Sequence, residues 1–353
     1  MKIKLAILEN DTNYLNRIVS VFSTKYADKI QIYSFTDLQI AISALGTEKI
    51  DVFIANDFFS IDVDELPKRC CFAYFVDNTD IETVGGQRAI CKFQKAELIY
   101  KQILSIYSEN AGNLAGLKLT DDESKIIIFS SPCGGNGTSS MAAGCALHFA
   151  QKGKRVLFLS FEDFGSSDLY FSGEGQFDMS DVIFALKSKK SNVAMKLESY
   201  VKIDPSGVYF FSKAKFALDM LELSHEERIQ LLTYVKMFGS YDYVVLDCAF
   251  GLDNKHIEYF KKAHNIVMVS DGSNISNMKI TNAFVSLLNI DQTLDASVVN
   301  RFSLVYNKFS SKTGSMLENV DLKSIGGAPI FLQANEQQIV EELSKLDLFE
   351  KLA

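Results

Sequence analysis

Residues 125–140 read KIIIFSSPCGGNGTSS, and this stretch decides the fold of the larger part of the chain. The apolar run 126–129 is typical of a short buried strand. Three glycines follow it closely: Gly134, Gly135 and Gly137. The next segment, MAAGCALHFAQ (141–151), has a helical composition and is followed by Gly153, a residue suited to ending a helix. The stretch therefore predicts a strand, a glycine-rich turn and a helix.

This order of elements points several backbone N–H groups and a helix N-terminus at a phosphate. Glycines are needed because a side chain would block the phosphate or forbid the backbone angles. The sequence departs from the standard phosphate loop, GxxxxGK[ST], because Thr138 stands where that loop carries its lysine. The turn could bind phosphate without that charge, or it could be a purely structural unit. The glycine-rich context favours phosphate.

The segment SPCGGNGTSS resembles the deviant Walker A segment of the MinD/ParA class of ATPases, KGGxGK[ST][ST]. Cys133 stands at the signature lysine of that class, and Thr138 stands at its second lysine. Loss of both is similar to the pattern of TadZ/CpaE-type pilus-assembly proteins, in which a receiver-like domain precedes a ParA-like domain. The resemblance implies a P-loop fold that binds ATP with Mg²⁺. The phosphate-wrapping loop would consist of Gly134, Gly135, Asn136, Gly137, Thr138, Ser139 and Ser140.

The same resemblance assigns roles to four side chains. Ser139 would bind Mg²⁺ directly, and Asp247, which ends the apolar run 243–246, would hold a water on the metal. Glu162 stands where the class carries its water-orienting aspartate, so Glu162 and Asp247 are the catalytic candidates. Asn307 is the candidate for contact with adenine. A helix-start serine, a strand-end carboxylate or a turn asparagine would give the same patterns without nucleotide, and these alternatives stay open.

Composition bounds the remaining possibilities. A chain of 353 residues is long for one core, so two domains are expected. A hydrophobic content of 47% and a net charge of −8 describe an acidic globular protein with no obligatory nucleic-acid partner. The six cysteines have no metal-ligand spacing, no apolar run reaches membrane-spanning length, and the N-terminus has no signal-peptide pattern. We therefore expect a cytoplasmic protein without direct membrane insertion.

Residues 1–108 read as a separate α/β unit with a parallel sheet of the receiver-like, flavodoxin-like kind. The strand candidates are 3–8, 30–35, 52–55, 72–76 and 89–92, and 96–107 is the closing helix. This region resembles a response-regulator receiver domain, with Glu9 and Asp11 after the first strand and Lys92 at the receiver lysine.

Asn56 stands at the place of the phosphate-accepting aspartate of a receiver, and asparagine cannot form an acyl phosphate. Asp57 comes one residue later, where the side chain of a strand residue faces the other way. We therefore expect a pseudo-receiver domain without a phosphoacceptor, which docks or dimerises. Phosphorylation, and a loop of merely solvated charges, are the alternatives.

The polar segment 109–123 is the expected linker, and 124–353 is expected to form the MinD/ParA-like nucleotide-binding domain. Both domains should be three-layer α/β structures. Further strand candidates are 155–161, 208–211, 265–270, 304–306 and 328–331, and further helix candidates are 181–186, 193–200, 224–238 and 276–288. Residues 337–352 predict an amphipathic helix whose acidic polar face would be repelled by anionic lipid, so it should pack on its own domain or on a partner.

Three functional hypotheses follow. The TadZ resemblance implies an ATP-binding localisation and scaffold protein for Tad-type pilus assembly. It would form a nucleotide-stabilised homodimer with weak or absent hydrolysis and would be recruited with pilus-assembly proteins to a cell pole. The alternative is an active MinD/ParA-type ATPase in partitioning or positioning, which would need another cation in place of the missing lysines. A signalling protein switched by phosphorylation is the third hypothesis, and Asn56 argues against it.

Overall fold

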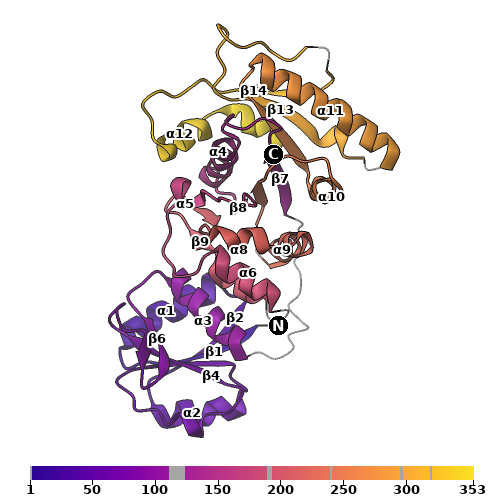
Figure 1. The fold of residues 1–353 in the computed structure, drawn as a ribbon. Coiled ribbons are helices and arrows are strands. Elements are labelled where there is room, and N and C mark those ends of the chain that lie inside the picture. Colours follow the sequence, from indigo (N-terminus) through magenta and orange to yellow (C-terminus); the bar gives the residue numbers. More distant parts are fainter. Residues whose placement is uncertain (1, 111–123, 189–192, 239–240, 295–296, 319) are drawn as a thin grey trace. The chain divides into compact units, whose positions relative to one another are not determined.

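The computed structural model describes residues 2–110, 124–188, 193–238, 241–294, 297–318 and 320–353 (Figure 1). The chain divides into two compact units. The first unit comprises residues 1–119 and 188–199, and the second comprises 120–187 and 200–353. Each unit has its own sheet and its own hydrophobic core, so each is described by itself.

The sheet of the first unit has the order β2-β1-β3-β4-β6-β5. Its strands are β1 (Ile3–Leu8), β2 (Ile30–Phe35), β3 (Val52–Asn56), β4 (Cys71–Val76), β5 (Thr83–Val84) and β6 (Gln87–Cys91). All pairs are parallel except β5–β6, which is an antiparallel pair that the sequence analysis did not predict. The predicted parallel, receiver-like sheet is confirmed.

Helices cover both faces of this sheet. They are α1 (Thr12–Lys25), α2 (Leu38–Thr47), α3 (Ala96–Asn110) and the short 3₁₀ turn η1 (Val63–Glu65). Apolar residues of α1 and α3 share one core, and those of α2 belong to a second core on the opposite face. Helix α7 (Val193–Tyr200) was predicted from the sequence. The burial of its Met195 in the core formed by α1 and α3 was not predicted.

The second unit is built on a sheet with the order β14-β13-β12-β7-β11-β8-β10-β9. Its strands are β7 (Lys125–Ser130), β8 (Val156–Ser160), β9 (Lys202–Ile203), β10 (Val208–Phe210), β11 (Tyr243–Asp247), β12 (Asn265–Ser270), β13 (Phe302–Tyr306) and β14 (Ser324–Gly327). All pairs are parallel except β9–β10. The three-layer α/β fold is therefore confirmed for both units.

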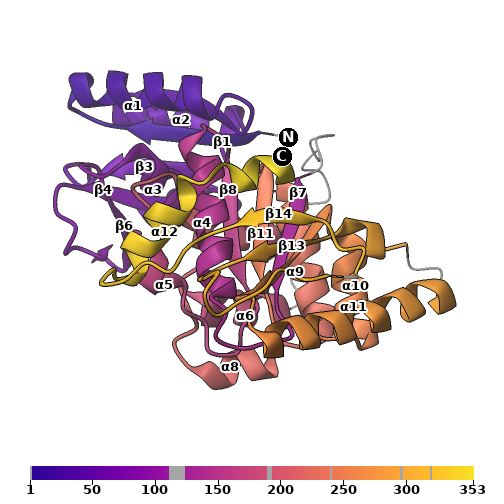
Figure 2. The ribbon, with the colours of Figure 1, turned by 90° about the horizontal axis from the view of Figure 1, so that it is seen from above.

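Figure 2 shows α4 and α12 on one side of this sheet and α9, α10 and α11 on the other. The helical elements are α4 (Thr138–Gln151), α5 (Ser167–Tyr170), α6 (Met179–Lys187), α8 (Ala217–Glu222), α9 (His225–Phe238), α10 (Asn254–Lys262), α11 (Asn274–Leu294), η2 (Val299–Arg301), α12 (Glu336–Ser344) and η3 (Asp347–Leu352). Helix α9 begins with the predicted capping box, in which Ser224 and Glu227 bond to each other's backbone N–H groups.

Two predictions about the end of the chain are wrong. The last strand is Ser324–Gly327 rather than 328–331, because Pro329 has no N–H to donate to a ladder. The closing helix is not continuous, since α12 ends at Ser344 and η3 begins at Asp347. The Nδ1 of His148 donates to the Ser344 carbonyl at 2.7 Å, so helix α4 occupies an acceptor that a continuing helix would use.

The C-terminal segment was expected to pack on its own domain or on a partner, and it packs on its own unit. Val340, Leu343 and Phe349 are buried in the same core as α4. A Cβ on Gly144 of α4 would lie 2.8 Å from the Cβ of Leu343, so a larger residue would push the two helices apart. Gly144 therefore permits close packing of α4 against α12.

Leu343→Ala should lower the free energy of unfolding by about 2–5 kcal/mol, because it removes a fully buried side chain and leaves a cavity beside Gly144. Glu341→Ala, at an exposed position of the same helix, should change it by less than about 0.5 kcal/mol. Denaturant unfolding of both variants measures the difference. Equal effects would mean that α12 does not pack on α4 in solution.

Candidate functional site

The glycine-rich turn after β7 has the backbone geometry that its sequence predicts. Gly137 is the N-cap of α4 with φ at 75°, and Gly135 has φ at 83°. Both values lie in the left-handed region that side chains disfavour. A Cβ on Gly137 would in addition lie 2.4 Å from the side-chain nitrogen of Asn307. Glycine is therefore required at position 137 for two independent reasons.

The turn is held in place by two asparagines. The side chain of Asn136 is buried and donates to the Val269 carbonyl at 3.0 Å and to the Ser276 hydroxyl at 3.3 Å. The side-chain nitrogen of Asn307 donates to the Asn136 carbonyl at 2.8 Å. The ends of β12 and β13 thus fix the turn before any ligand arrives.

Asp247 lies beside this turn at the end of β11. In the sheet order, β11 lies between β7 and β8, and Asp247 is in register with Phe129 and Ser160. The Asp247 side chain is buried, and its Oδ1 has no hydrogen-bond partner among the described residues. An unpartnered buried carboxylate oxygen is costly, so a site of this kind calls for a cation or a water.

The electrostatics of Asp247 lead to the same conclusion. Burial, followed by the charge of Glu162, raises the pKa of Asp247 to about 7, and hydrogen bonds from Ser139 and Ser160 act in the opposite direction. Asp247 therefore lies close enough to Glu162 and to Ser139 to interact with each of them. A bound cation would favour the ionised carboxylate.

The residues present fit Mg²⁺ but do not form a complete protein cage. Within the described ranges, no group of three or more His, Cys, Asp or Glu side chains could hold a metal. Mg²⁺ commonly uses one or two protein ligands and completes its octahedron with waters and substrate phosphates. Ser139 at the start of α4 and the unpartnered oxygen of Asp247 suit that arrangement.

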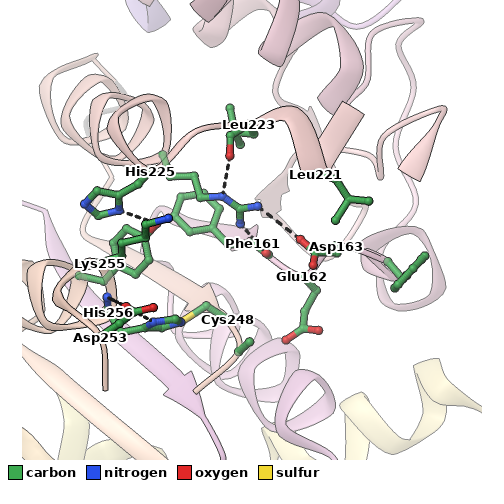
Figure 3. Close-up of a pocket in the computed structure, with 14 residues that line it drawn as sticks. Phe161, Glu162, Asp163, Leu221, Leu223, His225, Cys248, Asp253, Lys255 and His256 are labelled. Carbon is green, nitrogen blue, oxygen red and sulfur yellow. Dashed lines mark hydrogen bonds and ion pairs between the residues drawn. The ribbon is translucent and has the colours of Figure 1, made fainter. Parts of the chain in front are cut away.

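Glu162 also lines a pocket of about 470 Å³ at the ends of β8 and β11 (Figure 3). Its carboxylate points away from Asp163 in this view. Burial and the charge of Asp163 raise the pKa of Glu162, whereas Arg228 lowers it. Arg228 donates to the Phe161 carbonyl at 2.7 Å and lies 3.4 Å from Asp163, so it braces the segment that carries Glu162. The role of Arg228 was not predicted from the sequence, because no motif in helix α9 distinguishes this arginine.

Lys308 is a second residue whose position the sequence did not reveal. It is the second residue after β13, and its Nζ donates to the Gly135 carbonyl at 3.0 Å. The NK pair at 307–308 was the only available signal, and it gave no indication that the lysine reaches the glycine turn.

The receiver-like site of the first unit is closed by its own side chains. Glu9 is fully buried and accepts a hydrogen bond of 3.0 Å from the Asn56 side chain. Lys92 lies 3.6 Å from Glu9 and 2.9 Å from Asp77. Asp57 is exposed, in line with its predicted orientation. The Asn56 amide thus supplies a hydrogen-bond donor to the buried Glu9 carboxylate, which an ionised aspartate at this position could not do.

Asp247→Asn should stabilise the nucleotide-free protein above pH 7. The folded state keeps the proton of Asp247 up to about pH 7, while the unfolded chain loses it near the ordinary value of 3.8. Wild-type stability therefore falls as pH rises through this window. The gain should reach at most about 4.5 kcal/mol at pH 8, because the pKa rises from 3.8 to about 7 and each pKa unit corresponds to about 1.4 kcal/mol. It should shrink toward pH 4.

Urea unfolding at several pH values measures this gain, with Asp321→Asn as the control at an exposed position. A gain for Asp247→Asn that does not depend on pH would show that the carboxylate is not protonated in the folded state.

Asn56→Asp should destabilise the first unit by about 3 kcal/mol at pH 7, because it places a second carboxylate about 3 Å from buried Glu9. The loss should diminish at lower pH, where the pair takes up a proton. Asn78→Asp adds the same charge at an exposed position and should have little effect. Thermal unfolding compares the two; equal stability would refute the buried contact between Asn56 and Glu9.

Residues 1–108 match the family model described as TadZ-like, receiver domain. None of the curated proteins compared with the chain matches it. The ParA family ATPase from Chlorobium tepidum TLS is similar over 65% of this chain and 96% of its own, with 18% identity and a TM-score of 0.51. Two further structures are less similar. The MinC:MinD complex of Aquifex aeolicus has 15% identity and a TM-score of 0.48, over 65% of this chain and 96% of its own. MinD with Mg-ADP from Pyrococcus horikoshii OT3 has 14% identity and a TM-score of 0.48, over 63% of this chain and 94% of its own.

At these identities, the likeness to the Chlorobium protein shows the fold alone. The family model covers the first sheet and its helices, and the Chlorobium structure covers a share of the chain that corresponds to the second unit. The chain thus joins a TadZ-like receiver domain at its N-terminus to a C-terminal domain with the MinD/ParA fold.

Proposed function

We propose that the second unit binds ATP with Mg²⁺ and that the protein is a scaffold for Tad-type pilus assembly with weak or absent hydrolysis. The observation that carries this proposal is the left-handed glycine turn at the start of α4, next to a buried Asp247 oxygen that has no hydrogen-bond partner in the described part of the chain. The turn suits an anion, and the carboxylate suits a cation. Mg²⁺ with a triphosphate satisfies both.

Each site residue has a role in this proposal. The backbone N–H groups of residues 134–140 would surround the phosphates, and Ser139 would bind the metal directly. Asp247 would hold a metal-bound water and, with Glu162, would orient a water for slow hydrolysis. Asn307 would contact adenine through the part of its amide that the Asn136 carbonyl does not use.

Slow or absent hydrolysis follows from the side chains at the loop. Cys133 and Thr138 stand where the MinD/ParA class has lysines, so the loop itself brings no positive charge to the developing phosphoryl group. Backbone N–H groups and the helix dipole can hold a ground-state phosphate without a lysine. Binding without rapid turnover suits a scaffold whose assembly depends on the bound nucleotide.

The TadZ-like receiver domain supports the pilus-assembly assignment. We propose a nucleotide-stabilised homodimer that is recruited with pilus-assembly proteins to a cell pole, with the pseudo-receiver as a docking domain that has no phosphoacceptor. No helix in the described part of the chain is long and apolar enough to cross a membrane. The apolar face of α12 is buried against α4, so that helix has no free face for lipid.

Titration of purified protein with ATP and Mg²⁺ tests the proposal when binding, solution mass and phosphate release are followed together. We expect micromolar or tighter binding, an increase in mass to that of a dimer, and negligible phosphate release. Turnover at ordinary ATPase rates of about 1 s⁻¹ or more would instead support the partitioning-type ATPase. Absence of adenine-nucleotide binding by folded protein would contradict both functions.

Gly137→Ala should abolish or strongly weaken ATP binding, because its Cβ would collide with Asn307 and its φ of 75° is unfavourable for alanine. Gly153→Ala is the matched control. Its φ is 76°, and nothing lies within 4 Å of the added Cβ, so it carries the backbone strain without the collision at the loop. Calorimetric ATP titration of folded variants gives the comparison; equal affinities would show that the turn does not hold the phosphates.

A further inference from the structure

We infer that Lys308 supplies, from the end of β13, the positive charge that the glycine loop lacks, and that it binds the terminal phosphates of the bound nucleotide. This inference rests on the proposed binding of ATP. It names the cation that neither the loop sequence nor the comparisons assign.

The backbone at Lys308 is held in an uncommon conformation. Its φ is 57°, in the left-handed region, which is rare for lysine and is found preferentially at functional sites. The flanking N–H groups hold the turn: Asn307 donates to the Ser270 carbonyl at 2.7 Å, and Phe309 donates to the Ala328 carbonyl at 3.1 Å. The turn is therefore fixed by the ends of neighbouring strands.

This conformation brings the Lys308 side chain to the glycine turn. Its Nζ donates to the Gly135 carbonyl at 3.0 Å, and its Cε lies 3.5 Å from the place that a Cβ on Gly137 would occupy. Gly137 is the N-cap of α4 and lies within the segment 134–140, whose N–H groups are proposed to bind phosphate. The ammonium group therefore lies at the rim of the proposed phosphate site.

The charge of Lys308 is available to a ligand. Its side chain is exposed, and among the described residues no carboxylate lies within ion-pair distance of it. An ammonium group has three N–H bonds, and the Gly135 carbonyl accepts one of them. A phosphate oxygen is a stronger partner than a neutral carbonyl, and lysine commonly binds phosphate as a point charge.

Lys308 reaches the site from a different direction than a Walker lysine would. A Walker lysine belongs to the loop itself, at the positions that Cys133 and Thr138 occupy. Lys308 comes from β13, which is separated from β7 by β12. The ammonium group of Lys308 is placed to bind a phosphate. Because the same group donates to the Gly135 carbonyl, a phosphate bound to Lys308 would also influence the conformation of the loop.

The test compares Lys308→Asn, Lys308→Arg and wild type by calorimetric titration with ATP, ADP and AMP in the presence of Mg²⁺. Asparagine tolerates a positive φ, so it removes the charge with little backbone strain. We expect about 10- to 100-fold weaker ATP binding for Lys308→Asn, the range for loss of a charged hydrogen bond. AMP binding should change little, and Lys308→Arg should keep most of the ATP affinity.

Lys154→Asn is the control, since Lys154 is exposed in the turn between α4 and β8, at the opposite end of α4 from the glycine loop. Thermal unfolding without nucleotide establishes that the variants are folded.

Each other result overturns the inference. Unchanged ATP affinity of Lys308→Asn, with wild type binding ATP, would mean that another group, such as a cation of a second copy, supplies the charge. Equal losses for ATP, ADP and AMP would mean that Lys308 only orders the loop. Failure of wild type to bind any of the three would refute the proposed function itself, and the two failures are thereby distinguished.

Discussion

The second unit depends on one close approach, that of Gly137 to the side chain of Asn307. No other residue fits at position 137, because a Cβ would lie 2.4 Å from the Asn307 nitrogen and φ is positive. The contact joins the turn after β7 to the end of β13, two strands away in the sheet. It fixes the start of α4 and, with Asn136, holds the turn in the conformation that we propose binds phosphate without a loop lysine. The positions of Ser139 and Lys308 follow from the same junction.

The buried carboxylate of Asp247 is the second constraint on the site. It is buried, and one of its oxygens has no hydrogen-bond partner among the residues that the structure describes. Burial and the charge of Glu162 raise its pKa and so favour the protonated form. A protein selected for stability alone would replace such a group by an apolar one. Burial of the Asp247 carboxylate lowers stability, and binding of a cation would offset this loss. Ser139 would supply a second oxygen ligand for that cation. The opposite solution is seen in the first unit, where Asn56 and Lys92 satisfy Glu9 internally.

The sequence predicted features that depend on local patterns. Apolar runs such as those of β7, β11 and β12 identify strands buried on both faces, and the Ser224–Glu227 pattern identifies the start of α9, because these signals lie within a few residues. The gap in the closing helix could not be predicted, since its amphipathic pattern continues and the cause is His148 of α4. The position of Lys308 over Gly135 and the burial of Met195 with the first sheet are likewise products of tertiary packing.

The central claim is that main-chain N–H groups of the glycine turn bind the triphosphate. Hydrogen exchange of the backbone amides at residues 134–140, measured with Mg-ATP and with adenosine at saturating concentration, tests it most directly. The account predicts slower exchange of these amides with ATP and little change with adenosine. Unchanged exchange at the turn in a protein saturated with ATP would contradict it, because the nucleotide would then be held elsewhere.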